Sequence, residues 1–266
     1  MKILIGVNHA DYANLADLAN AQKQTWASVN DEDVQIIWAT GKNSWKFFTA
    51  LDARFFSVLG KPYLGSFAKP FMDFLGFATP KKPPKYAFNA SERSLKAKCL
   101  STKMLSTRKN LAVLNYFLNE TIADFYLQVN SSSYVNITTL KNFLKRYSGD
   151  DEFASGELIR DPIQNNPPVI TGAGRLLSRF AARKIMENFK MLKHNTVEDL
   201  VMGRVINELQ IKTLEVPMKH INSSDSVEKI NEIEGLEHYI FWCKSGIKHL
   251  NDAQIMKDLH MKLQSK

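Results

Sequence analysis

The chain has 266 residues, of which 44% are hydrophobic, 11% aromatic and 23% charged. This composition is typical of a folded globular protein and excludes a disordered or fibrous one. The two cysteines, Cys99 and Cys243, show no Cys-x-x-Cys spacing, which fits a reducing compartment and gives no support to a structural zinc site. No apolar run reaches the roughly 20 residues that cross a bilayer, and the opening apolar stretch is shorter than the core of a signal peptide.

The formal charge of +8 is concentrated in one part of the chain. Residues 42–109 hold fourteen Lys or Arg against three Asp or Glu, a net charge of +11, which leaves −3 for the rest. The same segment holds nine of the sixteen phenylalanines. Such a mixture is suited to an anionic membrane surface or a nucleic acid, or else it is a long connection whose aromatic rings pack on the core. We favour the membrane over nucleic acid, with the stretch 67–77 entering the interface, and expect a cytoplasmic protein lying peripherally on the inner face of the membrane.

Apolar periodicity predicts strands and helices that alternate along the chain. The predicted strands are 2–7, 34–40, 124–129, 153–160 and 238–242, and the predicted helices are 11–26, 101–119, 136–147, 175–189, 198–209 and 252 onward. This alternation indicates an α/β layered sheet. Because ligands of such sheets bind beyond the carboxyl ends of the strands, the residues after Val7 and Val129 are the first candidates for a site.

Four small polar residues follow the strand that ends at Val129, in the order Asn130-Ser131-Ser132-Ser133. Their hydroxyl, amide and backbone N–H groups suit phosphate oxygens or sugar hydroxyls, whereas a hard divalent cation prefers carboxylates. Taken alone, the same residues are better explained as an ordinary serine-rich helix cap.

Four short motifs occur in one order along the chain. They are Lys23-Gln24-Thr25-Trp26; the stretch 106–135, which opens Ser-Thr-Arg-Lys-Asn-Leu and contains Asn130-Ser131-Ser132; the turn 170–178 with Gly172-Ala173-Gly174; and Val197-Glu198-Asp199-Leu200-Val201-Met202-Gly203. Together they resemble the Fringe and β1,3-glycosyltransferase family, whose counterparts are Arg-Glu-Thr-Trp, a helix and strand leading to Asp-x-Asp and Tyr-Val, Ser-Gly-Ala-Gly-x-x-Leu-Ser, and Glu-Asp-Val-x-x-Gly. The resemblance covers about residues 1–217 and leaves out 42–101 and the C-terminal tail.

The resemblance implies a single-domain GT-A fold, a Rossmann-like mixed sheet flanked by helices. We expect the domain to span 1–235 with a basic aromatic insertion at about 42–101, and a basic strand-helix tail, 236–266, to pack on it. The implied activity is inverting transfer of a sugar from a nucleoside diphosphate donor, most simply a UDP-sugar, in which one general base takes the acceptor proton. Asp199 would be that base, with Glu198 as the alternative. Without the resemblance, both carboxylates would merely stabilise the start of their helix.

One departure from the family changes the expected chemistry. Asn130-Ser131-Ser132 stands where the family has its metal-binding Asp-x-Asp, so we expect no bound metal. Basic side chains would then stabilise the leaving diphosphate, and the candidates are Lys109, His238, Lys244 and Lys248. Lys244 is alternatively a solvent-facing lysine after a strand, and His238 a half-buried histidine with a backbone partner. The other expected donor-binding residues are Val7, Asn8, Lys23, Asn130, Ser131, Ser132, Gly172, Ala173 and Gly174.

The sequence therefore predicts a glycosyltransferase that uses a nucleotide sugar and a glycan or lipid-linked acceptor, in surface polysaccharide biosynthesis. The alternative is a catalytically dead GT-A scaffold that binds a membrane surface or another polyanion.

Overall fold

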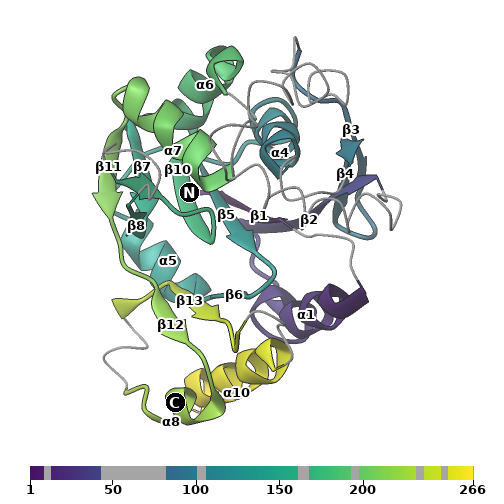
Figure 1. The fold of residues 1–266 in the computed structure, drawn as a ribbon, viewed down its shortest axis with the longest axis vertical. Coiled ribbons are helices and arrows are strands. Elements are labelled where there is room, and N and C mark those ends of the chain that lie inside the picture. The colour runs from purple at the N-terminus through teal and green to yellow at the C-terminus, as the bar shows by residue number, and fades with distance from the viewer. Residues whose placement is uncertain are drawn as a thin grey trace, which may run out of the picture.

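The computed structural model describes residues 1–8, 13–42, 82–100, 106–160, 168–192, 198–231, 237–246 and 251–265. The central feature is an eight-stranded mixed sheet in the order β11-β7-β10-β5-β1-β2-β4-β3 (Figure 1). Its strands are β1 (Ile3–Asn8), β2 (Val34–Lys42), β3 (Tyr86–Asn89), β4 (Ser94–Leu100), β5 (Phe125–Asn130), β7 (Phe153–Gly156), β10 (Gly174–Ser178) and β11 (Lys212–Glu215). The predicted α/β fold, a mixed sheet flanked by helices, is confirmed.

Two smaller sheets accompany the main one. The first has the order β12-β13-β6, from β12 (Lys219–Ile221), β13 (Ile240–Cys243) and β6 (Ser133–Val135). The second pairs β8 (Leu158–Ile159) with β9 (Val169–Ile170). Because β6 follows β5 after a short turn, the three-stranded sheet begins at the carboxyl end of the central strand.

Helices cover both faces of the main sheet. Those described are α1 (Ala13–Gln24), α4 (Ser106–Glu120), α5 (Ile137–Leu144), α6 (Arg179–Glu187), α7 (Glu198–Glu208), α8 (Ser224–Glu228) and α10 (Asp252–Gln264), with 3-10 turns at Trp26–Ser28 and Phe189–Met191. One core lies between the sheet and α4, α6 and α7. The other lies between the opposite face and α1, α5, α10 and the three-stranded sheet. Among the described residues, no helix combines the length and the apolar character needed to cross a membrane.

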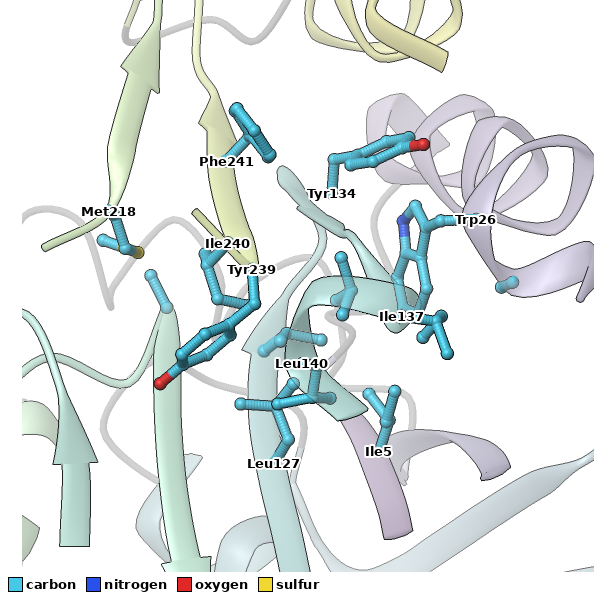
Figure 2. Close-up of a cluster of buried hydrophobic side chains, with 14 of the residues drawn as sticks. Ile5, Trp26, Leu127, Tyr134, Ile137, Leu140, Met218, Tyr239, Ile240 and Phe241 are labelled. Atoms are coloured by element: carbon cyan, nitrogen blue, oxygen red, sulfur yellow. The ribbon is translucent and has the colours of Figure 1, made fainter. Parts of the chain in front are cut away.

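Alternation along β1 and β5 divides the residues between these two cores, as expected for a strand buried on both faces. Ile5 and Leu127 belong to the core that contains α1, α5, α10 and the three-stranded sheet. Figure 2 shows them below Leu140 and Ile137 of α5. Tyr239, Ile240 and Phe241 carry this core into the three-stranded sheet (Figure 2). Leu4 and Tyr126 lie on the other face, with α4 and α7.

Two predictions of secondary structure were wrong in part. The segment predicted as a helix over 175–189 begins with a strand, β10, and the helix α6 starts only at Arg179, where the Ser178 side chain accepts a hydrogen bond from the Ala181 N–H. The segment predicted as one strand over 153–160 is two strands, because Gly156 has a φ of +151° and turns the chain between β7 and β8. The other predicted elements lie within a few residues of the observed ones where the structure describes them.

Candidate active site

The candidate site lies where three strands of the sheet and the starts of two helices meet. Asn8 and Asn130 are register partners at the ends of β1 and β5, and Gly174 pairs with Val129 at the start of β10. Asn8 Nδ2 donates to Asn110 Oδ1 in the first turn of α4, at 2.9 Å. Gln128 Nε2 donates to Glu198 Oε2 at the start of α7, at 3.1 Å. The carboxyl edge of the sheet is therefore lined with polar groups that the two helix N-termini cover.

A buried ion pair forms the centre of this region. Arg175 Nη1 donates to Glu198 Oε1 at 2.5 Å and to Gln128 Oε1 at 3.2 Å, while Nη2 donates to the Ile170 carbonyl at 2.9 Å. Arg175 is fully buried, and Glu198 is 6% exposed. Burial opposes the ionised form of Glu198, but the Arg175 charge and the surrounding hydrogen bonds outweigh it, so the pKa of Glu198 is lower than usual. Glu198 is therefore a fixed anion.

Asp199, the next residue, has the opposite character. Its side chain is 36% exposed, its Oδ1 accepts a hydrogen bond from the Gly172 N–H at 2.8 Å, and Arg175 Nη2 is 3.8 Å away. Desolvation and the negative charge of Glu198 raise the pKa of Asp199 to about 7. Of the two carboxyls left open by the sequence, Asp199 is the one that is accessible and exchanges a proton near neutral pH.

The turn from Gly172 to Gly174 is shaped by the carboxyls beside it. A Cβ on Gly172 would stand 2.5 Å from Asp199 Oδ1, 2.5 Å from Gln128 Nε2 and 2.7 Å from Glu198 Oε2. No side chain fits in that space, so glycine is required for the close approach of the turn to Asp199. Gly174 packs against Ile240 of β13, where an added Cβ would meet the Ile240 side chain at 3.1 Å.

The polar turn after β5 is held by contacts within the protein. Asn130 Oδ1 accepts from the Ser132 N–H and the Ser133 hydroxyl, and Ser133 Oγ also donates to the Ala173 carbonyl at 2.7 Å. Ser132 Oγ donates to Asp252 Oδ2 at 2.8 Å, which ties the turn to the start of α10. Ser131, Ser132 and Ser133 are all buried. These contacts direct the side chains of Ser132 and Ser133 into the protein.

Two residues that the sequence analysis did not select hold this turn in place. Gln22 of α1 is fully buried, and its Nε2 donates to the Asn130 and Ser131 carbonyls at 3.2 and 3.0 Å, while its Oε1 accepts from Trp38 Nε1. Asp252 is likewise fully buried, and its Oδ1 accepts from both the N–H and the hydroxyl of Ser245. A signal for Gln22 was present, because it is a polar residue in the apolar stripe of its helix.

The first turn of α4 brings cationic and polar groups to the same edge. Lys109 is 3% exposed, and burial lowers its pKa to about 8, although Cys99 and Glu198 favour its charged form. Within the described part of the chain, several buried polar atoms around this turn and the strands below it have no hydrogen-bond partner: Asn8 Oδ1, Thr107 Oγ1, Asn110 Nδ2, Tyr126 OH and Arg175 Nε. Buried polar atoms are normally satisfied, so this cluster is suited to a polar ligand or ordered water.

Several of the remaining predicted donor residues contact groups outside the carboxyl site. Val7 is a buried strand residue, and Lys23 Nζ lies 5.0 Å from the ring centroid of Trp38. His238 is half-buried and its Nδ1 is 3.0 Å from the Pro217 carbonyl, as the alternative expected. Lys244 Nζ lies 4.7 Å from the centroid of the Trp242 ring. Lys248 and the stretch 67–77 lie outside the described residues.

The side chains of this region offer hydroxyl, amide and ammonium groups and two carboxyls to a ligand. Among the residues that the structure describes, no three or more His, Cys, Asp or Glu side chains are grouped so that they could hold a metal ion.

No protein-family model matches the sequence. Three of the solved structures with a similar fold are glycosyltransferases. A glycosyltransferase involved in the glycosylation of the major capsid of PBCV-1 is 9% identical, with a TM-score of 0.49 over 97% of this chain and all of that one. The galactosyltransferase LgtC, in complex with donor and acceptor sugar analogs, is 9% identical, with a TM-score of 0.44 over 98% of this chain and 95% of that one. Mouse xyloside xylosyltransferase 1 is 11% identical, with a TM-score of 0.42 over 92% of this chain and 99% of that one.

Proposed function

We propose that the protein is an inverting glycosyltransferase related to the Fringe and β1,3-glycosyltransferase family. In this proposal Asp199 takes the proton of an acceptor hydroxyl while the acceptor oxygen forms a bond to the anomeric carbon of the donor. The bond between that carbon and the diphosphate breaks on the opposite face, and the nucleoside diphosphate leaves with the electron pair. The expected donor is a UDP-sugar.

The observation that carries this proposal is the contrast between two adjacent carboxyls. Glu198 is locked to Arg175 in the interior, whereas Asp199 is partly exposed with a pKa of about 7. A general base works best when its pKa lies near the operating pH, which is the property of Asp199. Helix capping alone would require neither the buried Arg175 nor the glycine against Asp199.

The leaving diphosphate would be stabilised without a metal ion. Lys109 lies close enough to Glu198 for the two charges to interact, in the first turn of a 15-residue helix whose N-terminus carries partial positive charge. The unpartnered amide and hydroxyl atoms of Asn8, Thr107 and Asn110 add donors and acceptors beside it.

The acceptor in this proposal is a glycan or a lipid-linked sugar used in surface polysaccharide assembly, and the enzyme lies peripherally on the cytoplasmic face of an anionic membrane. Support comes from three exposed lysines of the basic segment 42–109: Lys85, which precedes β3, and Lys96 and Lys98 of β4. These cations are available to anionic lipid head groups.

A donor screen by thermal shift, with and without EDTA, tests the proposal. We expect one nucleotide sugar to raise the melting temperature equally with and without chelator, because a ligand of the native state stabilises it by mass action. Asp199→Asn should keep donor binding and lose transfer by about 100-fold or more. Glu208→Gln, at the exposed far end of the same helix, is the matched control and should leave both unchanged. Loss of activity with EDTA and its recovery with Mn²⁺ would refute the metal-free mechanism.

A second candidate function is a catalytically dead scaffold that binds membranes or polyanions, which the exposed Lys85, Lys96 and Lys98 favour. The same screen separates the two. If no nucleotide sugar stabilises the protein, and binding to anionic vesicles falls steeply with salt, the binding function replaces the enzyme.

A further inference from the structure

A second cluster of side chains lies outside the carboxyl site, on the three-stranded sheet. We call it the Trp242 cluster, and its members are Glu157, His220, Trp242 and Lys244. His220 and Trp242 are register partners on β12 and β13, with ring centroids 5.2 Å apart and planes at 76°. His220 Nε2 lies 2.9 and 3.2 Å from the two Glu157 carboxylate oxygens. Lys244 Nζ lies 4.7 Å from the Trp242 ring centroid. An imidazole and an ammonium group thus lie against one indole ring, and a carboxylate lies against the imidazole.

The face of the sheet that carries this cluster is directed toward the glycine turn of the carboxyl site. Trp242 pairs with Ser133, whose hydroxyl donates to the Ala173 carbonyl, and Ile240, two residues away on the same face, lies against Gly174. Glu157 is connected to the same turn, because its carbonyl accepts from the Thr171 N–H at 3.0 Å. Thr171 immediately precedes Gly172, whose N–H holds Asp199. The cluster and Asp199 are therefore connected through two consecutive residues.

The exposure of the cluster distinguishes it from a core contact. The His220 side chain is 51% exposed and that of Glu157 22%, and Trp242 and Lys244 are both part-exposed. Trp242 packs against the core with part of its surface exposed, and its Nε1 is buried without a hydrogen-bond partner among the described residues. Trp38 is the informative contrast, because it also carries an ammonium group on its ring but is 6% exposed and its Nε1 donates to Gln22. Trp38 is built into the structure, whereas Trp242 offers ring surface.

We propose that the Trp242 cluster binds a pyranose ring of the acceptor, next to Asp199. An aromatic ring with a few convergent polar groups is typical of a small-molecule site, and the C–H face of a pyranose is apolar enough to cover an indole. His220 and Glu157 supply a donor and an acceptor for sugar hydroxyls at the ring edge. The Glu157 carboxylate disfavours a phosphate at this place, so the diphosphate lies on the α4 side of Asp199. The acceptor role of this sugar rests on the proposed function, whereas binding of the sugar does not.

The test uses protein whose four tryptophans carry ¹⁵N in the indole ring, observed by NMR. The probes are methyl β-D-glucopyranoside and methyl β-D-galactopyranoside, and D-mannitol is the acyclic control with similar hydroxyl content. Trp242→Phe assigns the Trp242 signal by its loss. We expect a saturable shift of the Trp242 N–H signal with at least one pyranoside and none with mannitol, while the Trp26 and Trp38 signals stay in place. No shift with either pyranoside would overturn the inference.

Variants of the exposed partners keep the test independent of any folding defect in Trp242 variants. Glu157→Gln combined with His220→Ala should weaken the pyranoside shift by at least tenfold in apparent Kd. Glu215→Gln, an exposed carboxylate on β11, should leave it unchanged. An equal response of both variants would overturn the assigned contacts.

A third arm separates acceptor from donor. Titration is repeated in the presence of UDP, and we expect the pyranoside shift to persist. If UDP alone shifts Trp242 or blocks the pyranoside, the ring belongs to the donor site and the acceptor assignment is wrong. These outcomes are distinguishable from failure of the proposed function. A pyranoside shift without stabilisation by any nucleotide sugar would support the sugar site and contradict the transferase activity.

Discussion

Arg175 and Glu198 lie in contact in the interior of the protein, with Nη1 and Oε1 2.5 Å apart, immediately before the part-exposed Asp199 carboxyl. Both charges are removed from water, so each depends on the other for compensation. This dependence makes the pair more than a local contact. It fixes a negative charge beside Asp199 and an arginine within 3.8 Å of it, and so controls the proton affinity of the proposed base.

Replacing Arg175 with Met should destabilise the fold by about 3–5 kcal/mol, because the buried Glu198 is left without its cation. The measurement is urea unfolding at pH 7. The double variant Arg175→Met, Glu198→Gln is the control, since it removes both charges and should recover part of the loss. A double variant as unstable as the single one would show that packing of the Arg175 side chain dominates.

The pKa of Asp199 predicts how activity depends on pH. If Asp199 is the base, kcat/KM rises with pH and levels off above about 7, because the carboxyl must be ionised to accept a proton. Glu198→Gln removes the neighbouring negative charge that helps to raise this pKa, so the rise should move to lower pH. If Glu198→Gln does not move the pH at which kcat/KM rises, the ionisation belongs to a group other than Asp199.

The same pKa also predicts a stability effect that needs no activity assay. The folded protein holds the Asp199 proton more tightly than the unfolded chain does, since the pKa rises from 3.8 to about 7 on folding. Stability from this group is therefore full below the lower value and is lost as pH rises through the higher one. We expect Asp199→Asn to raise the melting temperature relative to the original protein at pH 8, and by less at pH 4. An equal difference at both pH values would contradict the raised pKa.

Gly172→Ala should displace Asp199, because the new methyl group would meet three side-chain atoms of the site at 2.5–2.7 Å. Overpacking of this kind costs about 1–3 kcal/mol. We also expect the rise in the pH profile to shift, since the Gly172 N–H contact with Asp199 is disturbed. Gly149→Ala is the comparison, because the three atoms nearest to its new Cβ all belong to Asp124 and lie farther away, at 3.1–3.2 Å. If the pH profile of Gly172→Ala is unchanged, the turn at Gly172 does not influence the ionisation of Asp199.

Asp252→Ala should loosen the turn after β5, because Ser132 and Ser245 lose their shared acceptor. We expect a loss of about 2–3 kcal/mol in unfolding free energy and faster amide exchange at residues 130–133, measured by mass spectrometry. Ser132→Ala removes one of these hydrogen bonds and should cost about 1 kcal/mol. If exchange in the turn stays slow in Asp252→Ala, Gln22 alone fixes it.

The order of strands and helices was largely predictable because it depends on apolar periodicity. The central strands 2–7 and 124–129 follow continuous apolar runs and were placed within one residue. The error at 175–189 has a physical cause, because Arg175 in a strand is buried by a carboxylate partner that local sequence does not reveal. Ser178 was a usable signal for the true helix start, since it is an N-cap residue just before Arg179.

The site was predictable only where a local motif carried it. Glu198, Asp199 and Gly172 were selected from sequence; in the structure the Gly172 N–H donates to Asp199, and the Glu198 carboxylate lies beside the same glycine. Gln22 and Asp252 were not selected, because their role depends on segments more than 100 residues away in the chain. Neither the spacing nor the composition of a segment reports such long-range partners.

The three-stranded sheet has a consequence for how the protein reaches its native state. β6 at 133–135 lies beside the central strand, yet its partner β13 is not synthesised until residues 240–243. Pairing across such a sequence separation is slow, since a long loop must close before any contact compensates for its entropy. We expect the main sheet to form early on the ribosome and the three-stranded sheet to form last. Nascent chains arrested before residue 240 would therefore hold an open and incomplete site.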